Sequence, residues 1–176
     1  YRLQISSSGY ISTELGVSIP EQDFYDLPYT IDLTRAYGTL SGVVRLQNSD
    51  NHSGVGISVQ DGGATTLSDI NGAWSLSLPE GNYSGGVQFS TTNYSTGTQS
   101  ADIAIQGEGE TVLELVTLTR LTGTLSGSVT ENDGSTPVQS ATVSLNGTNV
   151  TTDNLGAFSF SDVPVGDHNL TLSAAG

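Results

Sequence analysis

Apolar and polar residues alternate along short stretches of the chain, a period of two that is typical of β-strands with one buried face. In AWSLSLP (residues 73–79) a tryptophan and two leucines alternate with serines, and in VGISV (residues 55–59) two valines and an isoleucine take every second position. Turns rich in Gly, Asp and Asn separate such stretches, and long runs of helix-forming residues are missing. The pattern predicts an all-β chain in which these two stretches share a core.

The chain also repeats itself. LTRAYGTLSG (residues 33–42) returns as LTRLTGTLSG (residues 118–127). Further aligned segments are SDINGAWSL (68–76) with TDNLGAFSF (152–160), LPEGNY (78–83) with VPVGDH (163–168), and the strand-like GGVQFS (85–90) with NLTLSA (169–174). This repeated part is termed the front. An internal repeat of this length indicates a structural unit that occurs more than once in the chain.

A second kind of segment, termed the back, follows the first front at residues 91–120 and predicts strands at Ala101–Ile105 and Thr111–Leu118 around a Gly-rich turn. Another back begins the chain. QISSSGYIST (4–13) aligns with QFSTTNYSTG (88–97), and both backs close with Leu-Thr-Arg. We therefore predict tandem β-sandwich domains, one complete and two complementary halves: residues 1–36 as a C-terminal half, 37–120 as a complete sandwich, and 121–176 as the N-terminal part of a second one.

A half sandwich exposes an apolar face and unpaired backbone groups, which invite another strand. The complementary half of a neighbouring copy is the obvious partner, and strand donation across the edge would satisfy both halves. Such a contact is heterologous, so it propagates into an open filament unless it closes a ring. We expect Leu3 and Ile5 of one copy to meet Leu170 and Leu172 of the next.

The alternative is that the halves are cuts in a longer covalent array of repeats. Leu170–Gly176 already corresponds to Leu3–Gly9, so joining copies end to end would duplicate about one strand. This duplication favours the filament over the array.

The second front carries a G-x-V strand, then ATVSL (141–145), TTDNLGAFSF (151–160) and VPVG (163–166). This pattern resembles the carboxypeptidase regulatory-like domain, a transthyretin-like (prealbumin-like) β-sandwich of about seven strands. The first copy departs from it at SVQDGGATTLSD (58–69). The resemblance implies a fold and a range of roles, namely stalk, accessory module of an enzyme, or surface or pilus-like protein, and it does not choose among them.

Charge and composition exclude several classes of partner and of chemistry. The net charge is −14 with four arginines and no lysine, which argues against nucleic acid as a partner. No apolar run approaches the roughly 20 residues of a membrane span. Cysteine is absent, so disulfides and thiolate chemistry are excluded. Related pilus sandwiches often use a lysine for isopeptide or sortase linkage; without that amine, subunits of this chain would join non-covalently.

Nothing in the sequence indicates catalysis or a metal site. His52 lies in a polar loop and His168 at the head of a strand, and no Ser and Asp are placed around either. Asp69 and Asp153 lead tight turns closed by glycine, and each turn offers too few oxygens for calcium, which needs six to eight. We expect no enzyme activity and no cofactor.

Six asparagines begin N-x-S/T sequons, which would make the chain a glycoprotein if it is exported. They are Asn51, Asn82, Asn93, Asn146, Asn149 and Asn169. Of these, Asn51, Asn146 and Asn149 lie in predicted loops and are the better candidate acceptors of covalent glycans.

The loop PEQDFYDLPYT (20–30) is the only aromatic-rich loop, and the other back has the plain AIQGEGETV there. We expect Phe24 and Tyr25 to form an inter-subunit contact, because aromatic side chains anchor interfaces. The combined hypothesis is an extracellular, pilus-like filament subunit. The alternative is a stalk or an adhesive region that binds surface glycans on a platform drawn from Tyr10, Tyr25, Tyr29, Tyr83 and Tyr94.

Overall fold

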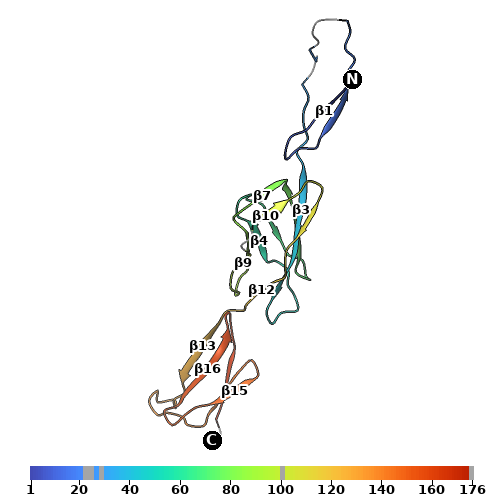
Figure 1. The fold of residues 1–176 in the computed structure, drawn as a ribbon. Helices are drawn as coiled ribbons and strands as arrows, with labels where there is room; N and C mark the ends of the chain where they lie inside the picture. The colour runs from blue at the N-terminus through green and yellow to red at the C-terminus, as the bar shows by residue number, and fades with distance from the viewer. Residues whose placement is uncertain (22–25, 28–29, 100–101, 175–176) are drawn as a thin grey trace. The chain divides into compact units, whose positions relative to one another are not determined.

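The computed structural model describes residues 1–21, 26–27, 30–99 and 102–174, and every regular element in them is a β-strand (Figure 1), which confirms the predicted all-β fold. The chain divides into two compact units, one of residues 1–91 with 96–118 and the other of residues 92–95 with 119–176. The predicted domain boundaries after residues 36 and 120 stay a prediction.

The first unit begins with a hairpin of two strands and continues into a sandwich. The hairpin strands are β1 (Arg2–Ile5) and β2 (Thr13–Gly16). The sandwich strands are β3 (Tyr37–Leu46), β4 (Gly56–Val59), β5 (Thr65–Leu67), β6 (Ala73–Pro79), β7 (Gly81–Tyr83), β8 (Val87–Ser90), β9 (Gly97–Gln99), β10 (Ile103–Ile105), β11 (Glu110–Val112) and β12 (Val116–Leu118).

Two sheets form the sandwich. One has the order β5-β4-β8-β9, and in the other β3 pairs with β6 along one edge and with β11 and β12 along the other. Strands β7 and β10 form a small two-stranded sheet of their own. Trp74 of β6 meets Phe89 of β8 edge to face, with ring centroids 5.8 Å apart. Ile57 and Leu78 are fully buried in the same core. The two alternating stretches predicted to share a core therefore do so.

The second predicted strand of the back, Thr111–Leu118, is wrong as a single element. It is broken into β11 and β12, and both run parallel to β3. Val112 lies opposite Ser41 and Val116 opposite Val44, so the back advances by four residues while β3 advances by three. The extra residue bulges out of the ladder and interrupts the strand.

The second unit repeats the front in its strand order. Its strands are β13 (Thr122–Ser128), β14 (Thr142–Leu145), β15 (Thr148–Thr151), β16 (Ala157–Pro164) and β17 (Leu170–Ser173). Strand β13 pairs with β16, and β14 lies between β15 and β17. The buried core is Val143, Leu145 and Phe160.

The two fronts differ by one residue, which the second copy absorbs in a bulge. Gly38 pairs with Leu78 in the first copy and Gly123 with Val163 in the second, but the ladder shifts register before Leu125 reaches Phe160. Asp162, beside the shift, has a φ of 55°. The bulge thus keeps the aligned segments LPEGNY and VPVGDH in equivalent places.

The predicted aspartate turns are confirmed in both copies. Oδ1 of Asp69 accepts the backbone N–H groups of Asn71 and Ala73, and Oδ1 of Asp153 does the same for Leu155 and Ala157. The glycines that close the turns, residues 72 and 156, have φ values of 80° and 72°, in the left-handed region that favours glycine.

Candidate assembly site

In the sandwich of the first unit, the back closes one side of the front. Strands β11 and β12 lie along the edge of β3, and β9 lies along the edge of β8. As a result Leu40 and Val44 of β3 and Phe89 of β8 are 0% exposed. The back therefore supplies both backbone pairing for two edges and cover for the core.

The same side of the second unit is open. Within the described residues, β13 pairs only with β16 and β17 only with β14. Leu125 and Val129, the counterparts of Leu40 and Val44, are only partly buried. Leu172, the counterpart of Phe89, is 56% exposed. The unit thus presents two unpaired strand edges and an apolar face at the positions that a back covers in the first unit.

The N-terminal hairpin has the register of the β8–β9 pair, which joins the last strand of the front to the first strand of the back. Leu3 pairs with Leu15 and Ile5 with Thr13, as Val87 pairs with Gln99 and Phe89 with Gly97 in the sandwich. The core position Val87 is fully buried, whereas Leu3 is 40% exposed and Ile5 is partly buried. The hairpin therefore has the strand pairing of a back without the cover of a front.

An apolar hollow of about 320 Å³ lies beside this hairpin, lined by Tyr1, Arg2, Leu3, Val17, Ile19 and Leu27. The ion pair that the described residues form in this region, Arg2 to Glu14 at 3.2 Å, joins two well-exposed side chains and adds little stability. Phe24 and Tyr25 lie outside the described residues, so their expected contact role stays a prediction.

A bridge between a tyrosine and an arginine closes each back, and it is termed the clasp. Tyr10 bridges to Arg35 in the hairpin, and Tyr94 bridges to Arg120 in the second unit. The flanking bonds also correspond: the residue after each tyrosine donates its N–H to the threonine carbonyl before each arginine, at 2.8 Å in both copies. The sequence alignment matched these residues between the two backs but gave them no structural role. The only sign of such a role in the sequence is that the Tyr and the Leu-Thr-Arg recur in both backs.

Strand β17 has the place in its sheet that β8 has in the first unit. Leu172 lies opposite Val143 of β14, as Phe89 lies opposite Ile57 of β4. Strand β1, the third copy of this strand, pairs with β2 instead. Of the four residues expected at the inter-subunit contact in described strands, Leu3 and Ile5 thus lie in the hairpin and Leu170 and Leu172 in the open unit.

The sequons fall in different settings. Asn51 is exposed in a loop, where its Oδ1 accepts the N–H of Ser53 at 3.0 Å. Asn146 lies in the β14–β15 turn, and its amide contacts Nδ1 of His168 at 3.0 Å. Asn149 does not lie in a loop as predicted but in β15, opposite Ser144. The Asn146-Gly147 pair, with φ values of 50° and 84°, makes a two-residue hairpin turn, so the strand begins one residue later.

The remaining sequon asparagines are Asn82 within β7, Asn93 with a φ of 67°, and Asn169 just before β17. Asn82 and Asn169 are exposed, and Asn93 is partly buried. Glycan attachment at all six sites stays a prediction.

Both histidines bond to the backbone. Nδ1 of His52 accepts the N–H of Leu46 at 3.1 Å. Nε2 of His168 contacts the carbonyl of Pro164, four residues earlier, and Tyr83 at the aligned position donates its hydroxyl to the carbonyl of Pro79 at 2.8 Å. These contacts tie down strand ends, and the expectation of no enzyme activity stays a prediction.

Two exposed aspartates brace turns, and their hydrogen bonds lower their pKa values. Oδ2 of Asp61 accepts the hydroxyl and N–H of Ser84 and the N–H of Gly85, each at 2.7 Å. These bonds, that of the Ser84 hydroxyl first, hold the pKa of Asp61 below its ordinary 3.8. The pKa of Asp133 is lowered in the same way, chiefly by the hydroxyl of Thr136.

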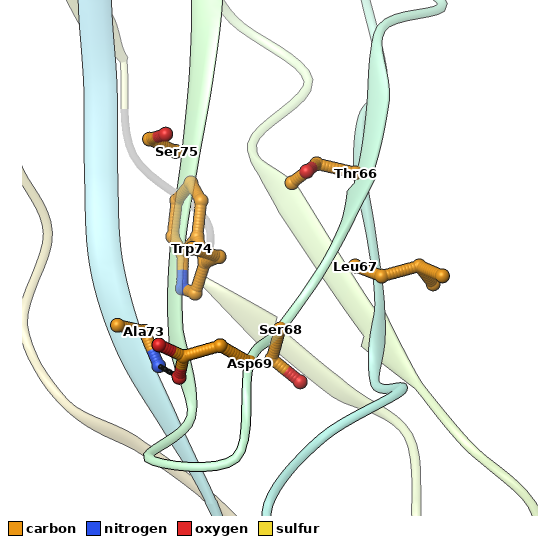
Figure 2. Close-up of a pocket in the computed structure, with 7 residues that line it drawn as sticks. All are labelled: Thr66, Leu67, Ser68, Asp69, Ala73, Trp74 and Ser75. Carbon is orange, nitrogen blue, oxygen red and sulfur yellow. Dashed lines mark hydrogen bonds between the residues drawn. The ribbon is translucent and has the colours of Figure 1, made fainter.

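An open hollow of about 540 Å³ lies beside Trp74, between β5 and β6 (Figure 2). Ser68 and Asp69 in its lining use their side-chain oxygens within the fold, whereas the buried Nε1 of Trp74 has no hydrogen-bond partner among the described residues. The hydroxyl of Ser68 donates to the carbonyl of His52 and accepts the N–H of Val55, and the Asp69 carboxylate holds its own turn, next to the Ala73 amide in Figure 2. Across the described ranges no three His, Asp or Glu side chains gather where they could hold a metal ion.

No helix in the described part of the chain is long and apolar enough to cross a membrane. None of the curated proteins matches this sequence. The family model described as "Carboxypeptidase regulatory-like domain" matches residues 124–176, which confirms the resemblance seen in the second front.

Among solved structures, the chain is similar to the Bacillus anthracis TIE protein, with 21% identity and a TM-score of 0.58 over 81% of this chain. The chain spans only 29% of the length of that protein. A streptococcal ancillary pilin matches 98% of this chain and 65% of its own, with 18% identity and a TM-score of 0.39. Of these two, the TIE protein alone exceeds a TM-score of 0.5 and bears on the fold. Residues 124–176 are thus similar to the carboxypeptidase regulatory-like domain, within a chain whose fold is all-β.

Proposed function

We propose that this chain is a structural protein of the cell exterior, a subunit of a pilus-like filament in which the back of one copy completes the front of the next. The observation that carries the proposal is the open side of the second unit. Its two free edges, on β13 and β17, are those that β11, β12 and β9 cover in the first unit. The N-terminal hairpin has the register of β8–β9, so β2 is the counterpart of β9. The rest of the N-terminal back, up to Arg35, would cover the edge of β13.

The apolar surfaces support this partnership. Leu3 on the hairpin and Leu172 on the open unit are both well exposed, although their counterparts in the closed sandwich, Val87 and Phe89, are fully buried. Burial of apolar area contributes about 25 cal/mol per Å², and pairing of the two edges would satisfy backbone groups at the same time. Assembly of this kind needs no lysine, no metal and no enzyme.

The strong acidity fits a repetitive surface structure. A net charge of −14 keeps subunits apart until specific pairing overcomes the repulsion, and it opposes binding to nucleic acid or to acidic surfaces. Glycans at exposed sequons such as Asn51 would add to this protection. In a stalk, by contrast, the open unit would be completed by residues of the same polypeptide.

The test is electron microscopy of the purified chain together with light scattering over a range of concentrations. We expect filaments that dissociate in denaturant into single chains of 18.2 kDa, plus any glycan mass. Leu3→Lys should abolish them, because it places a charge on the face of the hairpin that packs on the open unit. The matched control is Leu67→Lys, at a residue that is 66% exposed on β5 of the first unit. A monomer at all concentrations would refute the filament and favour the stalk.

A further inference from the structure

We infer that β17 is a removable strand, which covers the edge of β14 in the free subunit and is displaced by β1 of a neighbouring copy during assembly. The inference rests on the proposed filament, and it specifies which strand takes the shared position in the completed sandwich.

The two strands are copies of one element. Leu3 and Ile5 of β1 align with Leu170 and Leu172 of β17, and both strands align with Val87 and Phe89 of β8. A completed sandwich has room for one such strand between the strand that matches β4 and the strand that matches β9. A hairpin that docks on the open unit therefore brings one strand too many.

Two routes could resolve the excess. In the first route, addition, β17 stays on β14, β1 leaves β2, and β2 pairs with the free edge of β17. In the second route, exchange, β17 leaves β14, and β1 takes its place with β2 still attached. Each route breaks one strand pairing and forms another, so the number of pairings does not decide between them.

The structure of the hairpin favours exchange. Its β1–β2 register and its clasp, Tyr10 to Arg35, already match the β8–β9 register and the clasp of Tyr94 and Arg120. The N–H of Ala36 also bonds to the carbonyl of Gly9 at 2.9 Å, as the N–H of Leu121 bonds to that of Asn93 at 2.9 Å. Exchange keeps all of these bonds, whereas addition pulls β1 away from the loop that carries them.

The side chains of β17 are poorly buried, as expected of a strand that can be displaced from β14. Leu172 is 56% exposed and Leu170 is only partly buried, whereas Val87 and Phe89 are fully buried. While β17 is in place, it pairs one edge of β14 and so blocks random strand association there. A neighbour's β1 reproduces its pairing and brings β2 and the rest of the back as additional cover, so the exchange is favourable overall.

The test locks β17 to β14 in the full chain, whose lack of cysteine gives a clean background. Ser144 and Thr171 lie opposite each other across β14 and β17, so we would make Ser144→Cys with Thr171→Cys. The matched control, Ser144→Cys with Asn149→Cys, locks β14 to β15, a strand that stays in place. Thr142→Cys with Ser173→Cys is a second lock if the first does not oxidise.

We expect the oxidised β14–β17 lock to lower the filament yield at least tenfold and its reduction to restore assembly, while the oxidised control assembles like the unmodified chain. Cross-linking between copies then identifies the route. In the exchange route, Gln4 of one copy lies opposite Ser144 of the next, as Gln88 lies opposite Ser58 in the first unit. Gln4→Cys with Ser144→Cys should therefore join neighbouring copies. In the addition route, Glu14→Cys with Thr171→Cys should join neighbouring copies instead.

The outcomes separate this inference from the proposal on which it rests. Filaments that form with the oxidised β14–β17 lock, or cross-links between residues 14 and 171, would overturn exchange and leave the filament standing. A chain that fails to assemble even in its unmodified form would overturn both.

Discussion

Gly42 lies under the indole ring of Trp74, so closely that a β-carbon at Gly42 would come within 2.9 Å of ring atom Cζ2. The second unit has the same relationship between Gly127 and Phe158, where a β-carbon would come within 2.8 Å of Cζ. Each ring meets another aromatic ring edge to face, Phe89 for Trp74 and Phe160 for Phe158, but the two differ in burial, because Trp74 is 5% exposed and Phe158 is only partly buried.

Gly42→Ala should therefore lower the free energy of unfolding of the first unit by about 1–3 kcal/mol, because the buried indole would have to give up part of its packing to make room for the methyl group. Gly127→Ala should cost the second unit less than about 1 kcal/mol, because Phe158 can swing toward solvent. Trp74 is the only tryptophan, so its fluorescence during denaturant unfolding reports the first unit. Hydrogen exchange of β16 reports the second. Equal costs in the two units would contradict this explanation.

The buried hydroxyls of Ser68 and Thr152 give a second prediction. Each accepts a backbone N–H, of Val55 or Ala141, and donates to a backbone carbonyl. Ser68→Ala leaves two backbone groups unpaired in a site that is 5% exposed, so it should cost about 1–3 kcal/mol. The control is Ser75→Ala on the exposed side of β6, which should change the unfolding midpoint little. If both variants melt alike by tryptophan fluorescence, the hydroxyl bridge has no energetic role.

The lowered pKa of Asp61 predicts how the first unit responds to acid. A carboxyl whose pKa is lower in the folded than in the unfolded state adds stability above its unfolded pKa and loses it as the pH falls through the folded pKa. The loss should therefore occur below about pH 4. Asp61→Asn should be less stable than the unmodified chain at neutral pH and should converge with it in acid.

The measurement is the denaturant midpoint of the Trp74 transition at a series of pH values. Asp133→Asn is the control, because Asp133 lies in the second unit and its loss should not alter a transition of the first. A constant gap between the Asp61→Asn and unmodified curves down to pH 2 or so would show that the Ser84 bonds do not depend on the charge.

The sequence predicted the strands wherever alternation and turn chemistry agreed. The aspartate turns at Asp69 and Asp153 are local, since one carboxylate bonds to amides two and four residues ahead. The broken strand at 111–118 and the bulge at Asp162 could not be predicted in this way. They depend on how many residues the partner strand offers, which is a property of the pairing.

Of the candidate site, the repeat predicted which segments are equivalent and which apolar residues should meet. It could not show whether β1 or β17 pairs with β14, because Leu3 and Leu170 fit the same place equally well by sequence. It also missed the clasp, since a tyrosine and an arginine 25 residues apart in one back and 26 in the other show no link until backbone pairing joins them.

The last prediction compares Leu40 with Leu125, the same position in a closed and an open unit. Leu40 is 0% exposed, so Leu40→Ala should lower the free energy of unfolding of the first unit by about 2–5 kcal/mol at any protein concentration. Leu125 is only partly buried, so Leu125→Ala should cost the free second unit about 1 kcal/mol.

In the filament the difference between the two leucines should disappear, because a neighbour's back would bury Leu125 as β11 and β12 bury Leu40. Leu125→Ala should therefore raise the concentration needed for assembly by tenfold or more, since each factor of ten corresponds to about 1.4 kcal/mol of lost contact free energy. Hydrogen exchange of β13 at low concentration measures the first effect, and sedimentation of filaments measures the second. An unchanged assembly threshold would mean that the open face is not where neighbouring copies meet, because no contact that buries Leu125 could tolerate its truncation without cost.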